Sequence, residues 1–166
     1  MQFETVQWDD PRAVALRAAM DVETGAMYAD RAAAMDADGQ AAVNVALAID
    51  PSTIVHTIVV IDDDGSAVGH AALRPWGESL EVKKVYIAPQ ARGRGLSRAL
   101  MAEVERAALE RDIRSLVLQT GDLQLAAIAL YEAVGYRSVE VWAPYTAIPA
   151  SLCYRKDLTG AVQAMV

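Results

Sequence analysis

Apolar positions change their spacing along the chain, and each change indicates a different type of element. The first third is Ala-rich with apolar residues at helical spacing, and Asp10-Pro11 ahead of it is typical of a capped helix start. The middle consists of β-branched runs between turn residues, a pattern typical of strands. The predicted elements, in chain order, are strand 3–6, a helix from 11, helices 28–35 and 40–49 divided near Asp38-Gly39, strands 54–62, 67–74 and 80–87, a helix after Gly95, strand 115–120, helix 124–134, and strands 136–141 and 151–157.

The turns and the crossover define the fold class. Asp62-Asp63-Asp64-Gly65 predicts a hairpin turn, and Pro75-Trp76-Gly77 predicts a second turn. The helix after Gly95 lets strand 115–120 return parallel to strand 80–87. We expect a mixed α/β fold with a single central, mostly antiparallel sheet and helices on both faces, and one domain covering residues 1–166.

Charge is distributed unevenly, and this narrows the classes of partner. The chain has 15 Lys+Arg and 22 Asp+Glu, a net charge of −7, yet residues 82–102 carry five cations and no acid. An overall acidic chain argues against sequence-independent nucleic-acid binding. A single cysteine excludes an internal disulfide and a Cys-rich metal site, and no metal is expected. The apolar runs are too short for a membrane span, and the start lacks the features of a secretory signal, so a cytoplasmic location is expected.

The most informative stretch is the basic segment from Pro89 to Ser97, which joins a predicted strand to a predicted helix. Its two glycines, Gly93 and Gly95, allow the backbone to approach a ligand closely, and the amides at a helix N-terminus suit an anion. A Walker loop would need Gly-Lys-Ser/Thr, and a dinucleotide loop would need a third glycine where Arg98 stands. The segment therefore predicts a phosphate or pyrophosphate ligand. By alternation, Lys83 and Lys84 of the preceding strand are expected on opposite faces.

The segment Gln90-Ala-Arg-Gly93-Arg-Gly95 resembles the Gln/Arg-x-x-Gly-x-Gly/Ala signature of the GNAT superfamily of acetyl-CoA-dependent N-acetyltransferases. The resemblance extends from Leu80 to Tyr136 and includes the helix around Tyr131. It implies an acyl-CoA N-acyltransferase fold with acetyl-CoA as cosubstrate. The coenzyme residues that it implies are Val85, Tyr86, Ile87, Arg92, Gly93, Arg94, Gly95, Leu96, Ser97 and Gln124. Ser97 and Gln124 depart from the residues most frequent in the family.

The resemblance also implies catalytic roles for two residues. The Tyr131 phenol would protonate the leaving thiolate, and Glu81 would deprotonate the attacking amine directly or through water. A backbone N–H between Val85 and Ile87 would stabilise the oxyanion. The alternatives are that Tyr131 is an aromatic residue of an amphipathic helix and that Glu81 is a solvated carboxylate.

The acceptor is less defined than the coenzyme. Tyr145 and Trp76 are candidate substrate-binding residues, and the acidic remainder of the chain favours a small cationic amine or an amino-acid-like molecule. Acetylation of a protein N-terminus or lysine and a non-catalytic acyl-CoA sensor are the alternatives. The chain is expected to act as a monomer or homodimer.

Overall fold

A seven-stranded sheet in the order β1-β2-β3-β4-β5-β7-β6 forms the centre of the computed structural model, which describes residues 1–158. Only the β4–β5 pair is parallel, and all other neighbours are antiparallel. The strands are β1 (Gln2–Val6), β2 (His56–Ile61), β3 (Ala67–Trp76), β4 (Ser79–Ile87), β5 (Ser115–Gly121), β6 (Arg137–Val139) and β7 (Ser151–Asp157). The predicted mixed α/β class with a mostly antiparallel sheet is confirmed.

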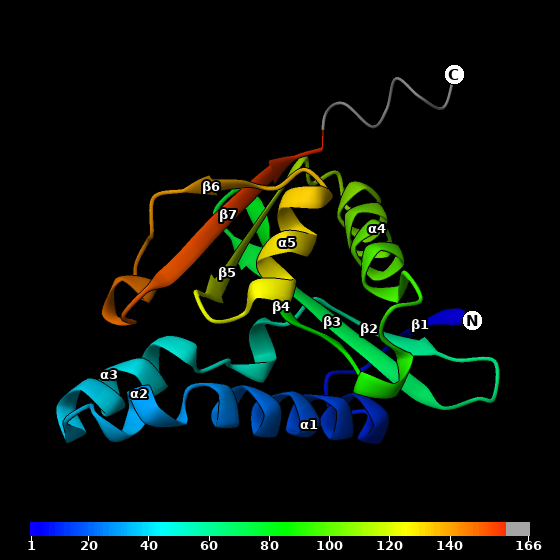
Figure 1. The fold of residues 1–166 in the computed structure, drawn as a ribbon. Helices are drawn as coiled ribbons and strands as arrows, with labels where there is room; N and C mark the ends of the chain where they lie inside the picture. Colours follow the sequence, from blue (N-terminus) through cyan, green and yellow to red (C-terminus); the bar gives the residue numbers. More distant parts are fainter. Residues whose placement is uncertain (159–166) are drawn as a thin grey trace.

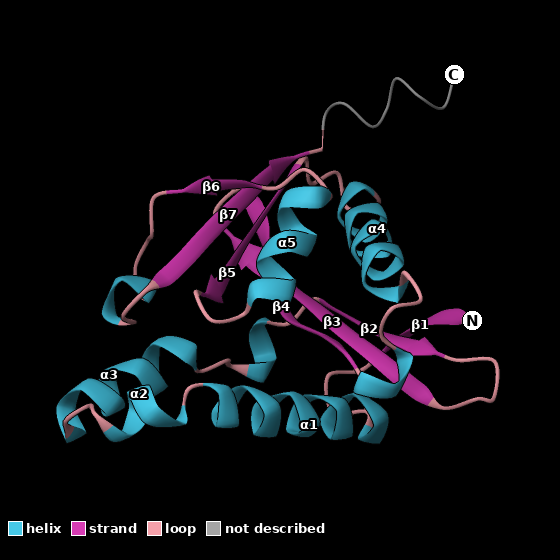
Figure 2. Cartoon of the chain, viewed as in Figure 1, coloured by secondary structure: helices cyan, strands magenta, loops and turns pink. Residues whose placement is uncertain are grey.

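The helices cover both faces of this sheet. Figure 1 shows the first three helices along one face and the last two against the other, and Figure 2 shows the strands between these layers. The helices are α1 (Pro11–Met27), α2 (Ala29–Ala33), α3 (Ala37–Leu47), α4 (Leu96–Leu109) and α5 (Leu125–Ala133), with single 3-10 turns η1 (Pro51–Thr53), η2 (Pro89–Ala91) and η3 (Tyr145–Ala147). Within residues 1–158, no helix is long and apolar enough to cross a membrane.

An apolar core lies between α4 and the middle of the sheet. Leu100, Met101 and Val104 of α4 are completely buried and belong to the same core cluster as Leu116 and Leu118 of β5. Burying side chains of this size stabilises the fold by about 1.5–3 kcal/mol each. This core fixes β4, the following loop and α4 relative to one another.

Two predicted breaks lie elsewhere in the structure. The second and third helices separate at Ala34–Asp36 rather than at Asp38-Gly39, because the Asp36 carboxylate accepts the Gly39 N–H at 2.8 Å and caps α3. The second hairpin also turns later than predicted, since β3 continues through Pro75 to Trp76. Pro75 is tolerated there because β2 pairs with β3 only as far as Leu73, so no partner on that side needs its missing N–H.

Candidate active site

The sheet opens between its two parallel strands. β4 and β5 pair only through Leu80–Leu116, Glu81–Val117 and Val82–Leu118, although both strands continue beyond these positions. From residue 83 onward, the edge of β4 that faces β5 therefore has no strand partner. Backbone N–H and C=O groups left at such an edge can pair with an extended ligand.

A bulge in β4 lies at the start of this gap. Lys84 has a left-handed backbone conformation (φ +54°), and the register with β3 shifts between His70 and Ala72. Non-glycine residues rarely adopt such angles, and they concentrate at functional sites. His70 holds this conformation, because its Nδ1–H donates to the Lys84 carbonyl at 2.8 Å.

The bulge also changes the direction of the Lys84 side chain relative to that of Lys83. Lys84 forms an ion pair with Asp21 of α1 at 2.6 Å, and Lys83 hydrogen-bonds to Tyr145 of η3 at 2.7 Å. Both lysines line the same cavity next to α1–α3. The prediction that alternation separates them is wrong, because the extra residue of a bulge interrupts the period of two.

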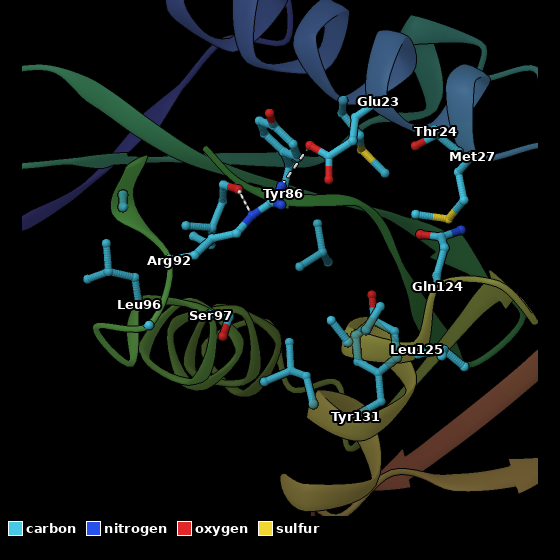
Figure 3. Close-up of a pocket in the computed structure, with 18 of the residues that line it drawn as sticks. Glu23, Thr24, Met27, Tyr86, Arg92, Leu96, Ser97, Gln124, Leu125 and Tyr131 are labelled. Atoms are coloured by element: carbon cyan, nitrogen blue, oxygen red, sulfur yellow. Dashed lines mark hydrogen bonds and ion pairs between the residues drawn. The ribbon is translucent and has the colours of Figure 1, made fainter. Parts of the chain in front are cut away.

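One cavity, of about 540 Å³, lies between α1, the end of β4, the N-terminus of α4 and α5 (Figure 3). We call it the loop cavity, because the glycine-containing loop forms one of its walls. Nine of the ten predicted coenzyme residues line it: Val85, Tyr86, Ile87, Arg92, Gly93, Gly95, Leu96, Ser97 and Gln124. The sequence thus predicted a set of residues that the fold brings to one cavity.

The loop itself is built to receive an anion through its backbone. Gly93 and Gly95 have φ of +76° and +77°, and open space lies where a Cβ would be added to either residue. Gly95 is the N-cap of α4, and no side chain caps the helix. The first N–H groups of α4 therefore lack an intrahelical or capping partner and carry the positive end of the helix dipole. These features fit a phosphate group.

The arginine side chains of the loop have other partners. The Arg92 guanidinium pairs with Glu23 at 2.7 Å and donates to the Ile87 carbonyl at 2.9 Å (Figure 3). This pairing lowers the pKa of Glu23. Arg94 lies outside the cavity and binds Asp62 of the first hairpin turn through two hydrogen bonds, of 2.6 and 2.8 Å. The anion-binding features of the site are thus mainly amides rather than arginine side chains.

A second cavity, of about 370 Å³, lies between the sheet and helices α1–α3. We call it the helix cavity. Its charged lining residues are Asp21, Arg31, Lys83 and Lys84. Met20, Thr24, Val85, Gln124 and Tyr131 line both cavities, so the two spaces meet at the gap between β4 and β5.

Tyr131 occupies the junction. It extends from α5, is 6% exposed, and points its hydroxyl into the loop cavity (Figure 3). Burial raises the pKa of Tyr131, so the phenol stays protonated throughout the physiological range. Its ring packs near Tyr136 and Tyr154, with centroid distances of 6.0 and 6.3 Å, which fixes its orientation.

The predicted base and acceptor residues lie outside both cavities. Glu81 is fully buried and forms ion pairs with Arg74 at 2.6 Å and Lys83 at 3.3 Å. Tyr145, also fully buried, donates its hydroxyl proton to Glu81, and Trp76 packs against Trp142. Neither Tyr145 nor Trp76 is placed to contact a molecule in either cavity. Glu81 can exchange a proton with the helix cavity only through its neighbours, not directly.

The residues that the sequence did not single out lie on the first helix and in β4. Met20 and Thr24 of α1 complete the junction between the cavities, and Lys83 lies on the sheet side of the helix cavity. An Ala-rich amphipathic helix carries no signal that separates these residues from ordinary packing positions. Within the described part of the chain, no group of three or more His, Cys, Asp or Glu side chains is placed to hold a metal ion.

Comparison with solved structures supports this geometry. A candidate acyl-CoA N-acyltransferase from Klebsiella pneumoniae is 32% identical, covers 95% of this chain and 97% of its own, and superposes with a TM-score of 0.75. A GNAT family acetyltransferase from Elizabethkingia anophelis with acetyl-CoA bound has a TM-score of 0.66 over 95% of this chain and 97% of its own. Because the latter is only 13% identical, it shows the fold alone.

Sequence comparison identifies the family. An IAA acetyltransferase from Azospirillum brasilense is 34% identical over 90 residues, which are 54% of this chain and 59% of that relative. The match thus spans little more than half of this curated relative. The profile of the acetyltransferase (GNAT) family matches residues 16–136, which contain β4, the glycine loop, α4, β5 and α5. The chain belongs to the GNAT acetyltransferase family.

Proposed function

We propose that this protein transfers an acetyl group from acetyl-CoA to a primary amine of a small acceptor, by direct attack within a ternary complex. The observation that carries the proposal is the meeting of the two cavities at Tyr131 in the gap between β4 and β5. The loop cavity would hold the coenzyme, and the helix cavity would hold the acceptor. A space of about 370 Å³ is suited to a small molecule.

The chain's own groups account for the binding of the coenzyme. The N-terminal amides of α4, with Gly93 and Gly95, would hold the pyrophosphate. The unpaired edge of β4 from Val85 to Ile87 would pair with the pantetheine arm as an added strand. When bound, acetyl-CoA supplies the thioester that serves as acyl donor.

Two groups at the junction would assist the transfer. Tyr131 donates its phenolic proton to the sulfur as the carbon–sulfur bond breaks, so that coenzyme A leaves as a thiol. A backbone N–H of the Val85–Ile87 segment donates to the thioester oxygen while negative charge develops there. The acceptor attacks as a free amine, so that the carbon–nitrogen bond forms as the carbon–sulfur bond breaks, and the proton that the acylated nitrogen then loses restores the Tyr131 phenol. Because Glu81 lines neither cavity, we propose that the ammonium proton passes to water in the helix cavity and not directly to Glu81.

Replacing Tyr131 by Phe tests the proposal. Tyr131→Phe is expected to retain acetyl-CoA affinity within about twofold in calorimetry and to lower the transfer rate by about 100-fold or more, the usual contribution of a general acid. The assay is thiol release with a panel of primary amines. Tyr136→Phe is the matched control, because Tyr136 is equally buried, lies beside Tyr131 and lines neither cavity. Equal rates for the two variants would contradict the role of Tyr131, and a wild-type protein that binds acetyl-CoA without transferring it would be a sensor.

A further inference from the structure

Lys83 is a buried cation on the sheet side of the helix cavity. Its side chain is 8% exposed, and its ammonium group donates to the Tyr145 hydroxyl at 2.7 Å and to Glu81 at 3.3 Å. An ammonium group has three N–H donors, so one remains for a further acceptor. Lys83 and Tyr131 both line the helix cavity, so a single small molecule could lie between them.

The buried cluster around Lys83 carries one excess positive charge. Arg74 and Lys83 share the single carboxylate of Glu81, and Tyr145 is neutral because burial raises its pKa. A buried cation that lacks a full counter-charge is destabilising, and desolvation accordingly lowers the pKa of Lys83. An anionic group placed in the cavity would offset this cost.

The other charged groups that line the helix cavity are already paired. Lys84 pairs with Asp21 at 2.6 Å. Arg31 binds Asp122 through two hydrogen bonds, of 2.7 and 3.0 Å. Among the charged residues that the structure places around this cavity, the excess is therefore located at Lys83.

From this charge pattern, we infer that the acceptor is an amine that also carries a carboxylate, with the carboxylate bound by Lys83 and the amine directed toward Tyr131. The inference rests on the proposed function and specifies its substrate class as amino-acid-like. It also favours this class over a purely cationic amine, because a second positive charge beside Lys83 would be repelled. The overall charge of −7 does not describe the local charge of the cavity.

The first test compares matched acceptors with the wild-type protein. Amino acids, their carboxamides and amines bearing a phosphate in place of the carboxylate are assayed by thiol release. The carboxylates are expected to be preferred over the carboxamides by about 10- to 100-fold in kcat/KM, the range of one charge-assisted hydrogen bond. Equal rates for acids and carboxamides, or a preference for the phosphates, would overturn the inference while leaving the proposed function intact. Absence of both acetyl-CoA binding and transfer would instead contradict the proposed function.

The second test assigns the preference to Lys83. Lys83→Met is expected to remove most of the preference by raising KM for the carboxylate acceptors, with acetyl-CoA affinity unchanged, and Lys83→Arg should retain part of it. Arg98→Met is the control, because Arg98 is an exposed cation of the same basic segment and lines neither cavity. Urea unfolding establishes that each variant is folded. A preference that persists in folded Lys83→Met would overturn the assignment.

Discussion

The contact between His70 and the β4 bulge leads to a quantitative prediction about pH. His70 is fully buried on β3, where its Nδ1–H donates to the Lys84 carbonyl and its Nε2 accepts from Arg17 at 3.1 Å. Arg17 in turn stacks on Trp8, with 3.6 Å between its guanidinium carbon and the ring centroid, and Trp8 contacts the His70 ring edge-on. Because Nε2 accepts a hydrogen bond, the ring is neutral with its proton on Nδ1.

The pKa of His70 sets the size of the expected change in the free energy of unfolding with pH. Burial first, and then the positive charges of Arg17 and Lys84, lower the pKa of His70 from 6.5 to about 4, against the opposing effect of the bond to the Lys84 carbonyl. Between these values the unfolded chain binds a proton that the folded protein does not, so stability falls as the pH falls. The contribution is complete above about pH 6.5 and is lost progressively down to about pH 4. At about 1.36 kcal/mol per pH unit, this interval corresponds to about 3 kcal/mol.

The measurement is the free energy of unfolding in urea for the wild type and His70→Asn from pH 7.5 to 4.5. Asn is the appropriate replacement because its amide N–H can take the place of Nδ1–H toward the Lys84 carbonyl. We expect the stability advantage of the wild type to shrink by about 2–3 kcal/mol over this range. Contributions from carboxylates and from His56 are common to both proteins and cancel in the difference. Parallel pH curves would refute the assignment of His70 as a buried neutral group that holds the bulge.

Two further substitutions test the loop and the buried cluster. Gly95→Asp is expected to weaken acetyl-CoA binding in calorimetry by at least about tenfold, because the carboxylate would cap the α4 amides itself and repel the phosphates. Gly77→Asp, at a positive φ in the turn at the other end of β4, should leave the affinity unchanged. Unchanged affinity in Gly95→Asp would contradict the phosphate assignment. Glu81→Gln leaves Arg74 and Lys83 without their carboxylate and is expected to cost about 3–5 kcal/mol in urea unfolding. If Glu81→Gln instead abolished the acidic limb of the pH–rate profile with little loss of stability, Glu81 would be the base.

Local patterns predicted most of the fold, and tertiary contacts account for what they missed. The strand, loop and helix from Leu80 onward follow from β-branched runs, two glycines and an amphipathic face, and all of these signals lie within the segment that they describe. The bulge at Lys84 depends instead on His70, which is 14 residues away in the chain. Nothing in the sequence around Lys84 marks a left-handed residue, and for that reason the shared direction of Lys83 and Lys84 could not be predicted.

The candidate site shows the same difference between what local patterns predict and what tertiary contacts determine. Nine of the ten residues proposed to bind the coenzyme could be placed at one cavity from the sequence, because the proposed contacts of the loop are made by backbone groups at fixed spacing. The proposed acceptor residues could not, because the helix cavity is lined by residues of four helices, two strands and the segment at Ile148-Pro149. Tyr145, a predicted substrate-binding residue, is fully buried, and its hydroxyl contacts Glu81, Arg74 and Lys83.

In the folded protein, most cations of the basic segment 82–102 form ion pairs with acidic side chains. Four of its five cations pair with acids from residues 1–81, as Lys83–Glu81, Lys84–Asp21, Arg92–Glu23 and Arg94–Asp62. The acidic part of the sequence therefore neutralises the basic segment within the fold. Within residues 1–158, a buried excess remains next to a cavity only where two cations, Arg74 and Lys83, share one carboxylate. The proposed preference for a carboxylate-bearing acceptor rests on that one unequal pairing, which no count of charges along the chain could reveal.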